Sequence, residues 1–230
     1  DKLTQVAEQA LANRSAATLN WSVGQVSFAK NRRNPNGPVD HDLPVLTIRD
    51  SAGKLMGVYV SYACHCVTLG EPMIGGDWAG YAQLLIEVGN PGCVALLSVG
   101  CAGDQNPNSP VGTDRIDLAR GQGELIAAEV SRLTQLTMTL LPNSIHCSWV
   151  DIELPLAELP SKADFEERAK LQTPVGYHAR KQLEKLNRGE SLNKFINYPI
   201  QLWSFGDSLC MVFLAGEVTV EYGLRLKAEL

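Results

Sequence analysis

The chain has no apolar run that approaches the ~20 residues needed to span a bilayer, and its first residues lack the basic, apolar and small-residue succession of a secretory signal peptide. A signal peptide that had already been removed would leave the same picture. Basic residues are dense in one place only, where Lys30 stands beside Arg32 and Arg33. Proteins that bind DNA or RNA need a broader basic footprint, so we predict no nucleic-acid partner.

Cysteine is also sparse. The six cysteines include no Cys-x-x-Cys pair, which excludes a zinc ribbon, and they are too few in 230 residues for a disulfide framework. Cys93, Cys101 and Cys210 lie in apolar runs and are predicted to be buried thiols. The formal net charge of -5, with 45% hydrophobic and 20% charged residues, is ordinary for a globular protein.

Strands and helices alternate along the chain without an internal repeat. This order predicts an α/β fold, a mixed β-sheet layered with helices, with active-site loops at the C-terminal ends of the strands. No linker is visible, so residues 1–230 are expected to form one domain. The predicted strands are 19–28, 45–49, 55–64, 93–100, 144–154, 198–204 and 209–214. The predicted helices are 3–12, 77–88, 115–133, a hairpin over 162–186 broken near 173–176, and 217–230.

A β-branched and aromatic run brings His65 to the end of the strand predicted over 55–64, just before a glycine-rich turn and a helix. Polar groups at such strand ends are where α/β proteins place their chemistry. Side chains alternate along a regular strand, so Cys64 and Cys66 should point away from His65. If His65 binds a metal, the other ligands must therefore come from elsewhere in the chain.

Two more predicted strand ends carry polar side chains. The strand over 93–100 runs into a turn of small residues, which let a backbone approach a ligand closely, although a turn held by Asx hydrogen bonds has the same composition. Glu217 opens the last predicted helix, where a carboxylate often only complements the helix dipole. If these strands are parallel neighbours of the strand that carries His65, the three ends converge. The polar residues of the turn are Asp104, Gln105, Asn106 and Asn108.

The segment 31–38, rich in Pro, Gly and Asn, is predicted to be a loop. Its arginines could reach an anionic or polar ligand, and a simple solvated turn is an equal alternative. The histidines outside the strand ends are predicted to be structural or solvated. They are His41, His146 and His178.

Taken together and in order, these segments resemble the N-terminal catalytic domain of the neutral/alkaline, non-lysosomal ceramidases, in particular a bacterial branch with an Asp-Gln-Asn-Pro motif. The resemblance implies zinc-dependent hydrolysis of the amide bond in N-acylsphingosines, which releases a fatty acid and a sphingoid base. It also implies a small-molecule or lipid N-acyl substrate, peripheral contact with a membrane, and a secreted or periplasmic location. The motifs that carry it are Asn31-Arg32-Arg33 with Val39-Asp40, Ala63-Cys64-His65, Gly76-Asp77-Trp78-Ala79-Gly80-Tyr81, Gly103-Asp104-Gln105-Asn106-Pro107-Asn108 and Gly216-Glu217.

The ceramidase family holds its zinc with two histidines, a glutamate and a tyrosine. His65 matches the second histidine and Glu217 matches the glutamate, so the resemblance makes both predicted ligands of Zn²⁺. The first histidine and the tyrosine correspond to positions before Asp1 and after Leu230. We therefore expect this chain to be a fragment of a longer catalytic domain, and to bind zinc weakly by itself.

Asn106 stands where characterised ceramidases have a catalytically important serine, and an amide cannot act as a nucleophile or proton relay. The predicted reaction is attack of a metal-activated water on the amide carbonyl, with Asp104 orienting the water or a ligand and Asn106 steadying the oxyanion. The residues predicted to contact the substrate are Arg33, Asp77, Tyr81 and Asn108.

Three alternatives stay open. A non-catalytic binding module would keep the fold and need no metal, and Asn106 is its best support. A hydrolase could act on a substrate that is not a sphingolipid. A thiol hydrolase could use Cys64 or Cys66, which requires a cysteine with a lowered pKa.

Overall fold

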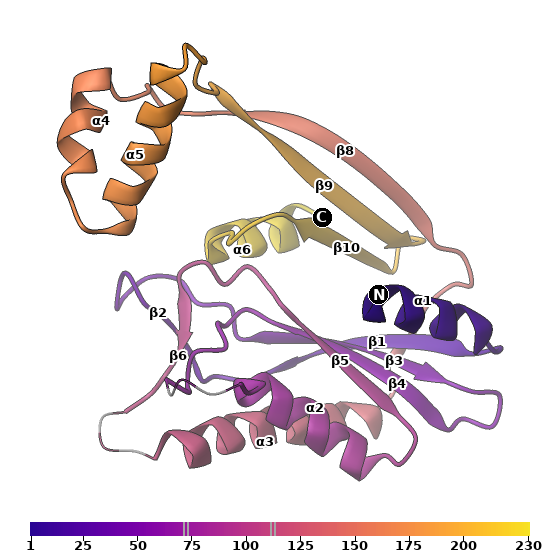
Figure 1. Cartoon of the computed structure of the whole chain (residues 1–230). Helices are drawn as coiled ribbons and strands as arrows, with labels where there is room; N and C mark the ends of the chain where they lie inside the picture. Colours follow the sequence, from indigo (N-terminus) through magenta and orange to yellow (C-terminus); the bar gives the residue numbers. More distant parts are fainter. Residues whose placement is uncertain (71, 73, 111, 113) are drawn as a thin grey trace. The chain divides into compact units, whose positions relative to one another are not determined.

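The structure, a computed structural model, describes residues 1–70, 72, 74–110, 112 and 114–230. The chain divides into two compact units, the first made of residues 1–147, 203–211 and 216–230 and the second of 148–202 and 212–215 (Figure 1). No linker marks this division in the sequence, because β8 (His146–Pro155) and β9 (Phe195–Phe205) cross it as continuous strands. That residues 1–230 form one catalytic domain stays a prediction.

The first unit contains a five-stranded sheet in the order β5-β4-β3-β1-β7. β4 and β5 are parallel, with Tyr62 opposite Val99, and the other neighbours are antiparallel. A tight turn at Asp50 joins β3 to β4. The sheet is therefore mixed, which confirms the predicted α/β class. Its strands are β1 (Thr18–Gln25), β3 (Asp42–Arg49), β4 (Leu55–Tyr62), β5 (Val94–Val99) and β7 (Thr139–Leu140).

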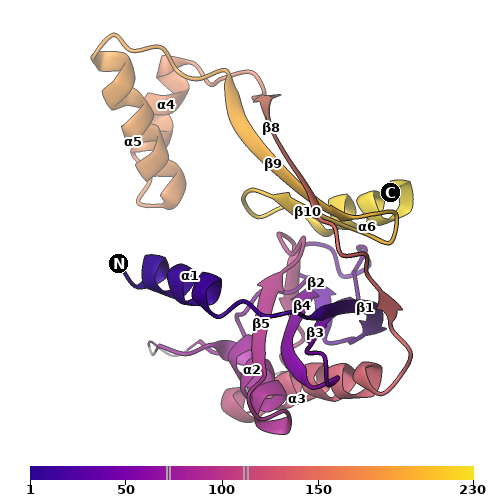
Figure 2. The ribbon, with the colours of Figure 1, turned by 90° about the vertical axis from the view of Figure 1, so that its right-hand side faces the viewer.

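Two helices, α2 (Asp77–Gly89) and α3 (Arg115–Thr134), cover one face of this sheet (Figures 1 and 2). The main apolar core lies between these helices and the sheet, and it includes Val58 and Val60 from β4 and Ile126 from α3. The helices touch closely because Gly123 in α3 has no side chain: a Cβ there would lie 2.6 Å from Tyr81 Cβ and 2.8 Å from Ala82 N. By contrast, α1 (Lys2–Ala12) buries none of its residues.

The opposite face of the sheet carries a smaller apolar cluster. Leu46 of β3 and Leu141 pack there with Phe205 from the end of β9 and Met211 from β10 (Leu209–Leu214). Alternation along β10 turns Cys210 outward while Met211 packs inward.

The burial of the three thiols was therefore only partly predicted. Cys93 is buried, Cys101 is half-buried, and Cys210 is exposed, so the prediction for Cys210 is wrong. The strand predicted over 93–100 is likewise less buried than its sequence indicates, because β5 lies at the edge of the sheet and leaves Val94 and Leu96 exposed.

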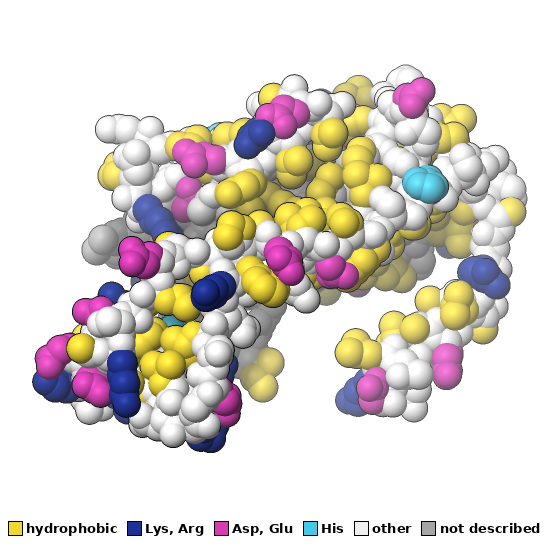
Figure 3. Space-filling view, turned by 90° about the horizontal axis from the view of Figure 1, so that it is seen from above, with side chains coloured by type: hydrophobic (Ala, Val, Ile, Leu, Met, Phe, Trp, Pro, Cys, Tyr) yellow, Lys and Arg dark blue, Asp and Glu magenta, His cyan; other side chains and the backbone are white. Residues whose placement is uncertain are grey.

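The second unit contains the predicted helical hairpin, α4 (Lys162–Ala169) and α5 (Pro174–Asn187). Ser161 and Asp164 form a capping box at the start of α4, and Thr173 caps α5 with Pro174 in its first turn. Charged side chains surround apolar ones on this hairpin (Figure 3). β8, β9 and β10 form a three-stranded sheet in the order β10-β9-β8. Within the described part of the chain, the structure contains no helix whose length and apolar character would let it cross a membrane.

Three short elements surround the candidate site in the first unit. β2 (Ala29–Asn31) pairs with β6 (Gln105–Pro107) in a separate two-stranded sheet, and α6 (Val220–Glu229) ends the chain. Two predicted boundaries are wrong here. β4 ends at Tyr62 instead of Cys64, and the last helix begins at Val220 instead of Glu217.

The close approach of α2 and α3 predicts opposite effects for two glycines in α3. Gly123→Ala should lower the free energy of unfolding by about 1–3 kcal/mol, because the methyl group meets backbone atoms of α2. A Cβ added at Gly121 meets no atom within 4 Å, so Gly121→Ala should raise the free energy of unfolding by up to about 1 kcal/mol, because alanine has the higher helix propensity. Urea unfolding of both variants checks this, and equal effects would contradict the packing described.

Candidate functional site

The site begins where β4 ends at Tyr62. The Tyr62 ring is buried against Phe28 and Trp78, with ring centroids 4.8 Å and 5.8 Å away. Its hydroxyl donates to the carbonyl of Val26 at 2.7 Å, and burial raises the pKa of this phenol, so the hydroxyl remains a donor. The chain then leaves the sheet in a tight turn, since Cys64 N donates to Tyr62 O at 2.9 Å. His65 therefore lies in a loop, and the predicted strand alternation does not apply to it.

His65 is held by its backbone on both sides. Its N–H donates to Gln105 O at 3.0 Å, and its carbonyl accepts from the indole N–H of Trp78 at 2.9 Å. The imidazole Nε2 is buried and has no hydrogen-bond partner within the described residues, and it lies 3.8 Å from the nearer oxygen of Glu217. A buried nitrogen without a partner, directed at a carboxylate, is the arrangement expected of a ligand-binding group.

Glu217 lies in the loop before α6 and not in a helical turn. Gly216 adopts a left-handed conformation (φ 76°), and the extended residue Thr219 is the N-cap from which α6 begins. Gly103 N donates to Val218 O at 2.8 Å, and a side chain on Gly103 would clash with the carbonyl oxygen of Glu217. Arg32 completes the contact: its guanidinium donates to Gly103 O at 2.7 Å and lies 3.8 Å from the Glu217 carboxylate.

Asp104 is buried, and both of its carboxylate oxygens are used. One oxygen accepts from Val220 N at 2.9 Å, and the other accepts from the Asn31 amide at 2.8 Å. Burial opposes ionisation, but these hydrogen bonds, together with one from the Gln105 side chain, outweigh it and lower the pKa of Asp104 below its ordinary value. Since the N-cap residue Thr219 makes no side-chain hydrogen bond to the helix, Asp104 satisfies the first N–H of α6 in its place.

The three predicted strand ends thus converge, but not for the predicted reason. β4 and β5 are parallel neighbours, whereas β10 belongs to a different sheet. Contacts from the loops after the strands bring His65, Asp104 and Glu217 together. The predicted catalytic role of Asp104 stays a prediction, and the bonds it makes give it a positioning role.

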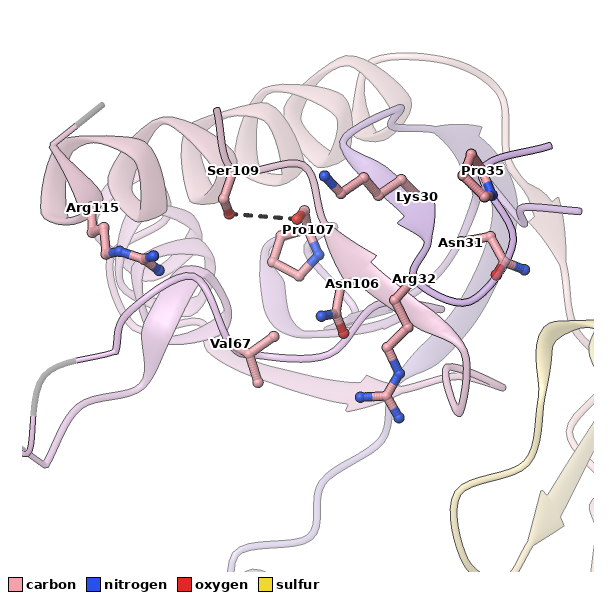
Figure 4. A pocket seen from close by; sticks show the side chains of 9 residues that line it. All are labelled: Lys30, Asn31, Arg32, Pro35, Val67, Asn106, Pro107, Ser109 and Arg115. Carbon is pink, nitrogen blue, oxygen red and sulfur yellow. Dashed lines mark hydrogen bonds between the residues drawn. The ribbon is translucent and has the colours of Figure 1, made fainter. Parts of the chain in front are cut away.

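Beside these residues lies an open cavity of about 520 Å³ (Figure 4). Asn106 lines it, and the Asn106 side-chain oxygen is buried without a hydrogen-bond partner among the described residues. The cavity walls come from β2 and the loop after it, from the loop after His65, from β6, and from the start of α3. The lining residues are Lys30, Asn31, Arg32, Pro35, Val67, Asn106, Pro107, Ser109 and Arg115.

The four residues predicted to contact substrate do not line this cavity. Arg33 is exposed, and its backbone N–H donates to the Asn31 side chain. Asn108 is exposed and accepts from Lys30 at 3.4 Å. Their roles stay predictions.

The other two of these residues belong to α2. Tyr81 faces α3, where the Arg120 guanidinium stands 5.8 Å from its ring. Asp77 is buried in a left-handed conformation (φ 54°), and its carboxylate accepts from the backbone N–H groups of Leu69 and Trp78, both at 2.7 Å. These bonds tie the loop after His65 to the start of α2.

Sequence reasoning gave no role to two of the three cationic residues of the cavity, Lys30 and Arg115. It expected the arginines of the 31–38 loop to reach a ligand and named Arg33 as the substrate contact, whereas Arg32 makes the contacts in the structure. The alternation of β2 is the local signal that could have found two of them: Asn31 is buried, so Lys30 and Arg32 point to the other side. Nothing local points to Arg115.

The cysteines give no support to a thiol hydrolase. Cys64 is fully buried, and burial raises its thiol pKa. Desolvation, with the Asp77 carboxylate adding to it, raises the pKa of the Cys66 thiol to about 11. A reactive cysteine requires the opposite shift.

His65 and Glu217 fit part of a metal site. Ligand atoms 2.0–2.2 Å from a tetrahedral zinc ion lie roughly 3.3–3.6 Å apart, and the two side-chain atoms here are 3.8 Å apart. No cluster of three or more His, Cys, Asp or Glu side chains suited to a metal occurs among the described residues. Within the described residues, His65 and Glu217 could therefore hold two of the three positions that protein ligands of a catalytic zinc ion usually take.

Fold and site together define a mixed α/β protein with a histidine and a carboxylate where loops follow its sheet. Comparison with models of protein families and with curated sequences finds no match. Among solved structures, the chain is similar to neutral ceramidase from Pseudomonas aeruginosa, with a TM-score of 0.73 and 18% identity over 98% of this chain and 44% of that one. It is also similar to a ceramidase complexed with C2, with a TM-score of 0.71 and 18% identity over 96% of this chain and 45% of that one.

This likeness shows a shared fold and confirms the resemblance to ceramidases at the level of the fold. The chain spans less than half the length of either ceramidase chain.

The hydrogen bonds of Asp104 predict a pH-dependent loss of stability. At neutral pH, Asp104→Asn should lower the free energy of unfolding by about 1–3 kcal/mol, because an amide cannot accept from both Val220 N and Asn31. A lowered pKa means that the carboxylate stabilises the fold above its ordinary value of 3.8 and that this contribution disappears as pH falls through the folded-state pKa.

The difference between the native protein and Asp104→Asn should therefore shrink as pH falls below about 3.8. Urea unfolding at several pH values measures it, with the exposed Asp207→Asn as a control that changes little. A difference that stays constant down to pH 3 (roughly one unit below the ordinary value) would contradict the role given to Asp104.

Proposed function

We propose that this chain is part of a hydrolase that cleaves the amide bond of ceramide-like N-acyl lipids with the help of Zn²⁺. The observation that supports it most is the buried Nε2 of His65, which has no partner in the described structure and lies 3.8 Å from Glu217. The shared fold with two ceramidase structures points to the same reaction. A secreted or periplasmic location and peripheral membrane contact belong to the same proposal and rest on the resemblance alone.

In this proposal His65, as neutral imidazole, and Glu217, as carboxylate, hold the ion. When bound, zinc lowers the pKa of a water molecule to about 7 and polarises the amide carbonyl. The backbone bonds from Gln105 and Trp78 orient His65 in the way that supporting residues commonly orient metal ligands. Arg32 places a positive charge 3.8 Å from the Glu217 carboxylate, which favours the orientation of that side chain toward His65.

Asn106 supplies both a donor and an acceptor at the cavity wall. Its amide N–H₂ can stabilise negative charge that develops on the carbonyl oxygen, while its side-chain oxygen needs a donor. Asp104 acts through position: it holds the 103–105 turn against the start of α6 and so keeps Glu217 near His65.

A second function, a non-catalytic binding module on the same fold, is favoured by the same Asn106. The characterised ceramidases to which the chain is likened have a serine there, and an asparagine cannot replace its proton chemistry. The two candidates differ in their need for metal, which makes metal binding the first measurement.

Zinc titration against a chromogenic chelator should show weak binding by this chain, because the described part of the structure brings together two protein ligands and no third. His65→Ala and Glu217→Ala should each weaken it by at least about tenfold. His178→Ala, a histidine of α5 outside the site, is the control and should leave binding unchanged. Zinc binding that is insensitive to both site substitutions would sink the proposed ligand pair.

Fatty-acid release from an N-acylsphingosine, followed by mass spectrometry, tests the reaction. We expect slow release that depends on added zinc, that falls by at least about a hundredfold in His65→Ala, and that persists in His178→Ala. Release without zinc would argue against the metal mechanism. Binding of the lipid with no release in the presence of zinc would favour the binding module.

A further inference from the structure

The cavity next to His65 and Glu217 is strongly cationic. Among its described lining residues, Lys30, Arg32 and Arg115 carry positive charges and no residue carries a negative one. This contrasts with the chain as a whole, whose formal net charge is -5. Figure 4 shows the three side chains reaching toward the cavity from β2, from the residue after it and from the start of α3.

Two of these three charges, those of Lys30 and Arg115, have no carboxylate beside them in the described structure. Arg115 donates to the carbonyl oxygen of Thr68 at 2.8 Å, and Lys30 donates to the Asn108 side chain at 3.4 Å, and both acceptors are neutral. Arg32 alone lies near a carboxylate, that of Glu217 at 3.8 Å, which is beyond hydrogen-bond distance. Like charges gathered around a cavity repel one another and attract an anion into it.

The cavity also offers hydrogen-bonding groups matched to an acylated amine. The buried side-chain oxygen of Asn106 lacks a donor in the described structure, and a secondary amide N–H supplies one. Arginine side chains bind the oxygens of planar carboxylates and tetrahedral phosphates through paired N–H groups.

Arg32 connects the two sites, because it lines the cavity and contacts Glu217. An anionic group in the cavity that reaches Arg32 would therefore lie near Glu217, and an amide next to it could reach Asn106, which lines the same cavity. An uncharged sphingoid head group would leave Lys30 and Arg115 without a counter-ion among the described residues.

We propose that this cavity is a subsite for an oxyanion of the substrate, so that the protein prefers N-acyl compounds carrying a carboxylate or a phosphate close to the amide. N-acyl amino acids and phosphorylated N-acyl amino alcohols are the two sources of such a group. This inference rests on the proposed amide hydrolysis, but the binding preference can be measured without it.

The test compares the affinity of the protein for three soluble ligands by isothermal titration calorimetry at low ionic strength. The ligands are N-octanoylglycine, N-octanoylethanolamine phosphate and the neutral N-octanoylethanolamine. Both anionic ligands should bind at least about tenfold more tightly than the neutral one. Salt at about 0.5 M should reduce this difference in affinity, because it shortens the screening length to a few ångströms. The tighter of the two anions identifies the source of the oxyanion.

Lys30→Gln and Arg115→Gln should each weaken binding of the anionic ligands by about three- to tenfold and leave the neutral ligand unchanged. Arg115→Lys keeps the charge and should restore part of the affinity. Lys54→Gln and Arg120→Gln are matched controls outside the cavity lining, and thermal unfolding of every variant shows whether the fold is kept. Equal affinity for neutral and anionic ligands, or a preference that survives both Lys30→Gln and Arg115→Gln, would overturn the subsite.

The two proposals can fail separately. Zinc-dependent hydrolysis of neutral N-acylsphingosine with no anion preference would overturn the subsite and leave the hydrolase in place. An anion preference that depends on Lys30 and Arg115, without any hydrolysis, would support the subsite and contradict the hydrolase.

Discussion

The buried carboxylate of Asp104 is the constraint on which the rest of the site depends. A carboxylate taken out of water stays ionised only where hydrogen bonds replace its hydration, and each such bond to a charged group contributes about 1.5–3 kcal/mol. Its two partners, the Asn31 side chain and Val220 N, belong to β2 and to the start of α6. One side chain therefore joins three segments that are far apart in the sequence, and the loop that carries Glu217 is placed as a result.

Near Asp104, hydrogen bonds of the backbone fix the positions of the site residues, and their side chains remain available to bind a ligand. His65 is bonded through its own N–H and carbonyl, so its imidazole Nε2 needs no structural partner. Gly103 lets the chain at Glu217 approach closely, and Arg32 bonds to Gly103 while facing Glu217. This division explains how a polar site can be rigid and still keep groups available for a metal, a water molecule or a substrate.

Local patterns predicted most of the elements but not their ends. The helices over 77–88 and 115–133 and the broken helical hairpin all follow from periodicity and turn chemistry, and the structure confirms them. The boundaries at Tyr62 and Val220 were missed because a turn to Tyr62 O and a bond from Asp104, both tertiary features, decide them. For the same reason Arg115 went unnoticed and Arg33 was named instead of Arg32, since Arg32 and Arg115 acquire their places through contacts with a distant part of the chain.

The amino-acid sequence by itself determined the α/β class, the order of the longer strands and helices, and which polar residues would stand after strands, because these depend on neighbours within a few residues. It did not predict the short strands β2, β6 and β7, which form through pairing with distant segments. Tertiary structure alone decided which of those residues meet. The sequence around Asp104 suits either a solvated Asx turn or a buried carboxylate that links two distant segments. Because β2 pairs with β6, and because Asp104 accepts from Asn31 and from Val220 N at the start of α6, the second arrangement forms. Likewise, three cations spread from residue 30 to residue 115 become one cavity wall only when the fold brings their segments together.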